Sequence, residues 1–252
     1  MSLIEQVRIK NLFLDTKLAE FEKELLKLEP KIRNVIIELA KKGDIRRETI
    51  QAAVNSFYYP IADKFINNYN EVLPYIKAIN DELGVAVVLP RTSLAMIDVM
   101  RYNNEAMLKL ANETIINDMT KAVLRYTNES PSFYKLVKGL EADRINSLRE
   151  SILTNDLDET LRLMRQRVAS EANTGLATYE RGIKDMQYKE AGIELFTYIG
   201  PSDKQTRTAC ANTLADRRNK TGFTRSEIDN ELDVDMLTGG GYNCRHDFYP
   251  VL

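Results

Sequence analysis

The sequence has no tryptophan, a single histidine and two cysteines among its 252 residues. Two cysteines, Cys210 and Cys244, are too few for the disulfide framework of a small secreted protein. The N-terminus lacks an apolar core followed by a small-residue cleavage site, so we expect no signal peptide. No apolar run approaches the roughly 20 residues that cross a bilayer, so we expect no membrane partner. These absences predict a soluble protein made in a reducing cytoplasm.

Strong net charge and common catalytic motifs are also missing. The formal net charge is -2, so no overall basic field attracts nucleic acid. The sequence has no Gly-x-x-x-x-Gly-Lys-Ser/Thr phosphate loop and no paired acidic motif with metal-ligand spacing. The sequence therefore carries no signature of a metabolic enzyme, and we expect it not to be one.

Glycine is scarce in the first 150 residues, which hold Gly43, Gly84 and Gly139 out of 11 glycines. Because glycine permits tight and left-handed backbone geometry, its placement predicts a helical first part and a turn-rich last part. We predict a mainly α fold, with a long helical N-terminal region over residues 1–150. A small α+β C-terminal domain is predicted to follow over residues 151–252.

Apolar residues recur at helical spacing through most of the N-terminal region. We expect helices over residues 3–28, 31–42, 45–72, 92–126 and 132–153. Pro30 is predicted to end or kink the first of these helices, and Pro60 is a candidate break in the third. Residues 84–89 are rich in β-branched side chains and suit a strand or a buried extended segment. The amphipathic helix 3–28 needs a second apolar surface, either a partner or its own domain.

The last hundred residues mix helix, strand and turn signals. A helix is predicted to begin at Asn155-Asp156, because acids suit the positive end of a helix dipole. Residues 192–200 place aromatic and β-branched side chains between two glycines and predict a strand. Asp203 is predicted to cap a short helix that carries Thr206, Arg207 and Cys210. Residues 239–241, three glycines, predict a flexible bend.

Four short fragments stand in a recognisable order in this part of the chain. They are Ser170-Glu171-x-Asn173-x-Gly175, Tyr198-Ile-Gly-Pro201-x-Asp203, Thr206-Arg207-x-x-Cys210 and Gly239-Gly-Gly-x-Asn243-Cys244-Arg245-His246. Over roughly residues 150–252 this ordered set resembles the C-terminal domain of the phage head-morphogenesis family, the Mu F-like minor head proteins. The residues that we expect to form its C-terminal constellation are Glu171, Asp203, Thr206, Arg207, Cys210, Asn243, Cys244, Arg245 and His246.

The resemblance implies an internal virion protein, present in few copies near the portal vertex after assembly in the host cytoplasm. Its implied partner is the portal protein, with the major capsid or scaffold protein and nonspecific DNA as further partners. Domains of this family can be fused to toxin or transferase modules, and we see no such module in the sequence up to Leu252. The alternative is a nucleic-acid-binding or toxin-like enzyme that uses the Cys/Arg/His site near the C-terminus.

Cys210, Cys244 and His246 form the richest set of potential metal ligands. Two thiolates and an imidazole suit a structural zinc ion, with a fourth ligand from Asp203, Asp216 or Asp247. Many members of the resembling family have a further cysteine where this chain has Arg207. Two other interpretations stay open, namely a pair of small buried cysteines without cofactor and a disulfide. A cysteine nucleophile is disfavoured, because a histidine two residues away is poorly placed as its base.

Two arginines of the constellation, Arg207 and Arg245, can each form bidentate bonds with a carboxylate. Asp203 and Glu171 are their natural partners, either in a network that fixes the terminal loop or in a catalytic pocket. A separate basic cluster in a turn suits contact with DNA phosphates or a solvated face. Its members are Arg217, Arg218 and Lys220.

Overall fold

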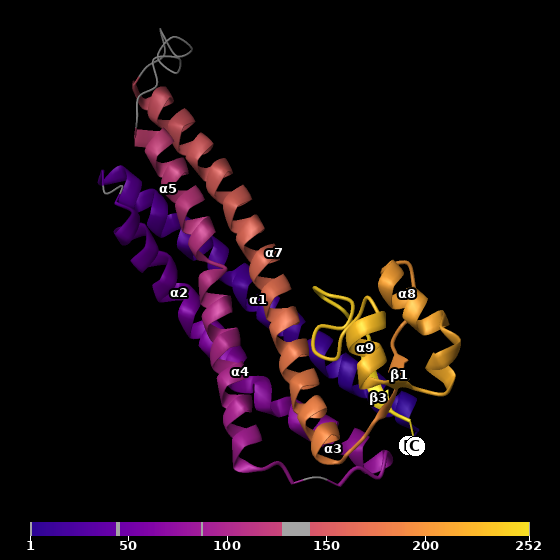
Figure 1. The fold of residues 1–252 in the computed structure, drawn as a ribbon. Helices are drawn as coiled ribbons and strands as arrows, with labels where there is room; N and C mark the ends of the chain where they lie inside the picture. The colour runs from indigo at the N-terminus through magenta and orange to yellow at the C-terminus, as the bar shows by residue number, and fades with distance from the viewer. Residues whose placement is uncertain (1, 44–45, 87, 128–141, 252) are drawn as a thin grey trace. The chain divides into compact units, whose positions relative to one another are not determined.

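The computed structural model describes residues 2–43, 46–86, 88–127 and 142–251. The protein is mainly helical with a small antiparallel sheet near the C-terminus, which confirms the predicted fold class (Figure 1). The helices are α1 (Leu3–Lys41), α2 (Arg47–Asn67), α3 (Leu73–Glu82), α4 (Arg91–Leu110), α5 (Glu113–Thr127), α7 (Ala142–Glu190), α8 (Thr208–Ala215) and α9 (Arg225–Glu231). The 3-10 helices are η1 (Asn68–Val72) and η2 (Arg217–Lys220), and the strands are β1 (Leu195–Ile199), β2 (Phe223–Thr224) and β3 (Asp247–Pro250).

The chain forms two compact units that are not consecutive in sequence. Unit 1 comprises Met1–Leu18, Ile66–Asn104 and Ala172–Leu252, and unit 2 comprises Ala19–Phe65 and Glu105–Glu171. Helices α1, α2, α4 and α7 each contribute residues to both units. The boundary expected between residues 150 and 151 falls inside α7, so the units do not coincide with that division.

Helix α1 runs through Pro30, so the prediction that this proline ends the helix is wrong. Pro30 is exposed, and the buried face of the helix continues across it from Leu28 to Ile32. Burial of that face offsets the one backbone hydrogen bond that proline cannot donate. The helix ends at Lys41, and Gly43 follows with a φ of 73°, the left-handed stop that the sequence predicts.

Helix α7 begins at Ala142, so the predicted helix start at Asn155 is wrong. The apolar face predicted downstream of that point is present and fully buried: Leu157, Leu161, Met164 and Val168. Leu153 is buried as well, so the face extends upstream of Asn155 and one continuous helix buries more apolar surface than two would. The helix expected over 132–153 lies partly outside the described residues.

The structure differs from the sequence-based expectation at two further places in the N-terminal half, residues 92–126 and residues 84–89. The helix expected over 92–126 is divided into α4 and α5. Residues 84–86 and 88–89 form no strand. Gly84 follows α3 with a φ of 64°, and Val88 is almost fully exposed, so the prediction of a buried segment is wrong as well.

Unit 1 contains the sheet, in which β1 pairs antiparallel with both β2 and β3. Strand β1 confirms the strand predicted within 192–200. Its register places Tyr198 opposite Phe248 and Ile199 opposite Asp247, so β3 brings the end of the chain alongside β1. Phe196, Phe223 and Phe248 are almost fully buried in the core beneath the sheet. This pairing places residues 244–246 beside the segment that follows β1.

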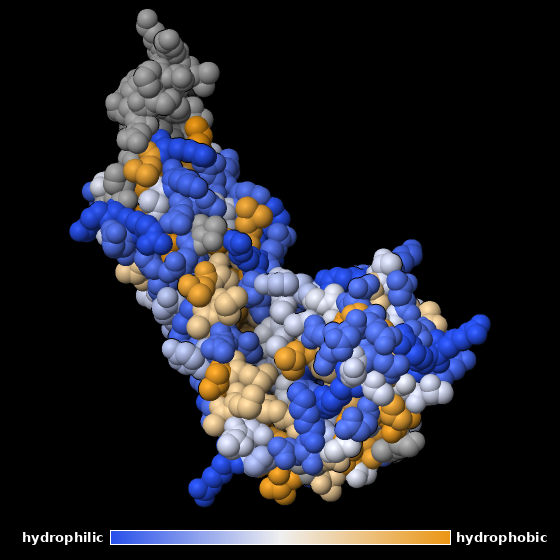
Figure 2. All heavy atoms as spheres, in the orientation of Figure 1, coloured by the Kyte–Doolittle hydropathy of each residue, from blue (hydrophilic) through white to orange (hydrophobic). Residues whose placement is uncertain are grey.

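The surface on the face shown in Figure 2 is largely hydrophilic, with small separate apolar areas. Large apolar side chains that remain exposed in unit 1 include Met96, Val99 and Tyr102 of α4. None of the helices in the described part of the chain combines the length and the apolar character that crossing a bilayer requires.

Candidate metal centre in unit 1

Three side chains that can ligate a metal meet in unit 1, and we call them the Cys-Cys-His cluster. Cys210 lies in α8, and Cys244 and His246 lie in the segment that leads into β3. The two Sγ atoms are 3.7 Å apart, and Cys244 Sγ is 3.8 Å from His246 Nδ1. All three side chains are buried, and their ligand atoms lie within 4.8 Å of one another. The structure thus brings together the three residues that the sequence proposes as metal ligands.

The glycine bend at 239–241 wraps closely around the two sulfur atoms. The backbone N–H of Gly240 donates to Cys244 Sγ at 3.2 Å. A Cβ atom at Gly240 would fall well inside van der Waals contact with Cys210 Sγ. Gly239 has a φ of 60° and Asn243 a φ of 56°, so the backbone is left-handed on both sides of the bend. The close approach to sulfur explains why position 240 requires glycine.

We expect Gly240→Ala to lower the free energy of unfolding by about 1–3 kcal/mol, because the added methyl group overpacks the sulfur site. Urea denaturation followed by circular dichroism measures this loss. The matched control is Gly182→Ala in α7, where the new methyl group meets mainly the flexible end of Met100 and alanine favours the helix. A Gly240→Ala protein as stable as the wild type would contradict the close packing described here.

His246 is held in place through its second ring nitrogen. Its Nε2 lies 2.7 Å from the carbonyl oxygen of Pro201, and a carbonyl can only accept, so Nε2 carries a hydrogen. Nδ1 is therefore the nitrogen that can accept a proton from Cys244 or bind a metal. The ring of Tyr198 stacks on the imidazole, with centroids 5.5 Å apart and planes 14° apart. His246 is therefore not poorly placed as a base for Cys244, contrary to the expectation from sequence, since its Nδ1 lies 3.8 Å from Sγ.

The two thiols of the cluster differ in acidity. Burial opposes ionisation of Cys244, but contacts with His246, the Gly240 N–H and the charge of Arg181 lower its pKa to about 6. Burial raises the pKa of Cys210, and the hydroxyl of Tyr198, 3.4 Å from Cys210 Sγ, opposes that rise only in part. Cys244 is therefore the more readily ionised ligand of the pair.

The terminal loop is anchored by one of the two expected arginine–carboxylate contacts. Nη2 of Arg245 donates to both carboxylate oxygens of Asp203 at 2.8 Å, as the sequence predicts. Asn243 accepts a hydrogen bond from Asn173 of α7 at 3.1 Å. Glu171, the other expected carboxylate, belongs to unit 2.

Arg207 plays a different part from the one predicted. Its guanidinium donates to the backbone carbonyl oxygens of Gly240, at 2.9 Å, and of Tyr242, and so holds the glycine bend. Helix α8 begins at Thr208, so the prediction that the short helix carries Thr206 and Arg207 is wrong. Thr206 instead closes the preceding turn, because its Oγ1 donates to the Pro201 carbonyl at 2.9 Å.

The expected fourth metal ligand does not come from an aspartate. Within the described ranges, no carboxylate oxygen joins the Cys-Cys-His cluster. Each of the three proposed aspartates is engaged by basic side chains: Asp203 by Arg245, Asp216 by Arg218, and Asp247 by Lys10 and Lys184. We therefore reject these three residues as the fourth ligand.

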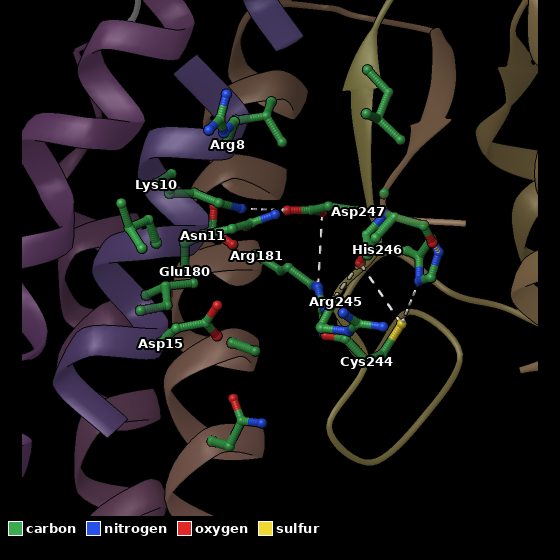
Figure 3. Close-up of a pocket in the computed structure, with 18 of the residues that line it drawn as sticks. Arg8, Lys10, Asn11, Asp15, Glu180, Arg181, Cys244, Arg245, His246 and Asp247 are labelled. Atoms are coloured by element: carbon green, nitrogen blue, oxygen red, sulfur yellow. Dashed lines mark hydrogen bonds and ion pairs between the residues drawn. The ribbon is translucent and has the colours of Figure 1, made fainter. Parts of the chain in front are cut away.

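A buried charge cluster is formed by Lys10, Glu180, Arg181, Lys184 and Asp247. Figure 3 shows its members other than Lys184 near Cys244 and His246 of the Cys-Cys-His cluster. Nζ of Lys10 lies 3.0 Å from Glu180 and 3.2 Å from Asp247. Lys184 contacts the same two carboxylates. The cluster joins the first helix of unit 1 to α7 and β3.

Arg181 connects the two clusters. Its Nη2 donates to the carbonyl oxygens of Cys244 at 2.6 Å and of His246 at 2.9 Å, so it fixes the backbone between the two ligands. Figure 3 shows its side chain reaching from α7 toward this segment, beside a cavity of about 480 Å³. Sequence reasoning missed this residue and the charges around it. A signal existed in α1, because Lys10 falls at helical spacing between the apolar residues Val7 and Leu14.

The basic cluster of η2 is partly neutralised within the protein. Arg218 forms ion pairs with Asp216, Glu227 and Glu231 and lies over the ring of Phe223. Arg217 and Lys220 are exposed. The last two are the cations of the cluster that remain suited to phosphate contact.

Comparisons of the chain with family models, with curated proteins and with solved structures found no match. The resemblance to the phage head-morphogenesis family therefore depends on the four sequence fragments alone. Most residues of the expected C-terminal constellation lie in the Cys-Cys-His cluster or in the contacts that Arg207 and Arg245 make beside it.

Proposed function

We propose that the protein is a phage minor head protein, an internal virion component that binds the portal protein and assists head assembly and DNA packaging or ejection. The observation that carries this proposal is the contact between the sequence fragments. Asn173 bonds Asn243, Asp203 bonds Arg245, and Arg207 bonds the bend before Asn243. Three contacts therefore join different fragments, and this proximity supports the proposal that they form one structural site.

The geometry supports a structural role for this site rather than a catalytic one. The Nε2 of His246 contacts a backbone carbonyl, whereas a catalytic histidine is usually oriented by a carboxylate. The two arginines hold the terminal loop through Asp203 and backbone carbonyls. We therefore propose that the constellation fastens the terminal segment of a virion protein and performs no turnover.

The portal protein is the proposed principal partner, with the major capsid or scaffold protein as a further one. Nonspecific contact with DNA is proposed through the exposed Arg217 and Lys220, since Arg218 is paired with carboxylates. We place the protein inside the capsid near the portal vertex.

We expect the protein to co-purify with the portal protein of the same phage and to appear in purified virions in few copies. Quantitative mass spectrometry of gradient-purified virions and a pull-down with the isolated portal protein measure this. The control is a pull-down with the major capsid protein alone, which separates portal binding from general capsid association. Absence of the chain from virions that contain portal protein would overturn the proposal.

A further inference from the structure

We propose that the Cys-Cys-His cluster binds one zinc ion through three protein ligands and leaves the fourth position open to the adjacent cavity, where an anionic oxygen ligand from solution completes the tetrahedron. The proposal stands on the geometry of unit 1 and is independent of the role in the virion. It differs from the four-ligand site expected from sequence, because no aspartate supplies the fourth ligand.

Two of the three distances between ligand atoms in the cluster match the edges of a tetrahedral zinc site, and all three ligand atoms lie within 4.8 Å of one another. With Zn–S near 2.3 Å and Zn–N near 2.05 Å, two sulfur ligands lie about 3.8 Å apart, and sulfur and nitrogen about 3.6 Å apart. The structure has 3.7 Å between the sulfurs and 3.8 Å between Cys244 Sγ and His246 Nδ1. A disulfide would instead require the sulfurs to close to about 2.05 Å.

The contacts around the ligands are those that support a bound metal. The Pro201 carbonyl holds the far nitrogen of His246, so Nδ1 faces the sulfurs. Cys244 Sγ accepts the Gly240 N–H, and Cys210 Sγ accepts the hydroxyl of Tyr198. Donors aimed at both sulfurs favour thiolates, and two buried thiolates repel each other unless a cation lies between them. Two thiolates with a neutral imidazole balance the charge of Zn²⁺ and suit its preference for sulfur and nitrogen.

The fourth position faces solvent through a cavity of about 210 Å³. All three ligands line this cavity, together with Gln205, Arg207, Asn243 and Arg245. A zinc ion with three protein ligands and one exchangeable ligand has the open position that catalytic zinc sites also keep. Here the open position binds an anion and turns over no substrate, in agreement with the structural role proposed for the constellation.

The charges on the cavity wall favour an anionic fourth ligand. Asp203 balances the charge of Arg245. Arg207 donates to two backbone carbonyls and forms no ion pair with any described residue, so its positive charge has no acidic partner. An oxygen anion such as hydroxide or a carboxylate would meet both the metal and this guanidinium.

The metal is tested on the full chain, purified under reducing conditions from cells grown with zinc. We expect about one zinc per chain, and replacement by Co²⁺ should produce thiolate charge-transfer bands and intense tetrahedral d–d bands. Cys210→Ser, Cys244→Ser and His246→Gln should each lose the cobalt bands. Thr197→Ser in β1, whose hydroxyl donates to the Asn219 carbonyl and to no ligand of the cluster, should keep them.

The open position is tested by titrating the Co²⁺-loaded protein with acetate as the carboxylate probe. We expect a saturable change in the d–d bands, with a dissociation constant at least about tenfold weaker in Arg207→Gln, which corresponds to about 1.4 kcal/mol. Arg217→Gln is the matched control and should bind acetate like the wild type.

Three results would overturn the proposal, and two of them need no variant that risks misfolding. The first is wild-type protein that is folded by circular dichroism but binds no zinc or Co²⁺. The second is a cobalt spectrum that acetate does not change, which would show a closed site. The third is full metal retention in a folded Cys244→Ser protein. A portal-binding failure with metal binding intact would contradict only the proposed function.

Discussion

Replacing Asp247 with asparagine is expected to lower the free energy of unfolding by about 3–5 kcal/mol, because the change leaves the buried cations Lys10 and Lys184 with Glu180 as their one remaining carboxylate. Asp247 is 5% exposed and contacts Lys10 and Lys184, whose side chains are 3% and 1% exposed. Asparagine keeps the shape and removes the charge. Urea denaturation monitored by circular dichroism measures the loss.

The acidity of Asp247 supports this expectation. Burial alone would raise its pKa, but the ammonium groups of Lys184 and Lys10, with the guanidinium of Arg181, hold the pKa of this carboxyl well below its usual range. A carboxyl with a lowered pKa in the folded state stabilises that state at neutral pH. Asparagine loses this contribution at every pH at which the carboxylate is ionised.

Two variants separate the charge effect from a packing effect. Asp203→Asn makes the same chemical change in an exposed ion pair and should cost far less than Asp247→Asn. The double variant Lys184→Met with Asp247→Asn also removes the charge of Lys184, one of the two ammonium groups that contact Asp247. It should therefore be more stable than Asp247→Asn alone. If the double variant is the less stable of the two, the loss does not come from uncompensated charge.

Truncating Phe248 to alanine is expected to cost about 3–5 kcal/mol, the range for deleting a buried aromatic ring. Phe248 is 1% exposed, and its ring centroid lies 4.6 Å from that of Tyr198 and 6.4 Å from that of Phe223. Since Tyr198 stacks on His246, the cavity left by the ring should also loosen the Cys-Cys-His cluster. Urea denaturation measures the stability loss, and cobalt binding measures the loosened site.

Phe248→Leu is the control for this prediction, because leucine keeps much of the buried volume. It should cost clearly less than alanine and leave cobalt binding close to the wild type. Equal losses for leucine and alanine would show that the aromatic contact with Tyr198, rather than buried volume, carries the effect.

The helical character of the fold could be predicted from the sequence, but the helix ends could not. The buried positions Leu157 to Val168 follow directly from apolar spacing. Pro30 and the acids near Asn155 are local signals for a helix terminus. At both places the helix continues, because its apolar face continues past the signal. Local capping is worth about 1 kcal/mol, less than the burial of an extended helix face. No short stretch of sequence indicates which distant segments pack together in each unit, so this part of the fold could not be predicted.

The candidate site was partly predictable for a similar reason. Cysteine, histidine and arginine carry recognisable chemistry, so Cys210, Cys244 and Arg245 could be proposed from residue type and order alone. The backbone contacts of Arg207 could not, because any carbonyl can accept a hydrogen bond and none is marked in a sequence. The charge cluster was missed because a single buried lysine such as Lys10 resembles the many exposed ones.

The ion pair between Lys10 and Asp247 spans 237 positions of the chain. A nascent polypeptide presents the lysine early in synthesis and the aspartate only near the end. Until β3 emerges from the ribosome, the lysine lacks one of its two carboxylates and the third strand of the sheet is missing. Unit 1 should therefore complete its folding late, by a slow closure of distant segments, and only chains synthesised through β3 can complete its sheet.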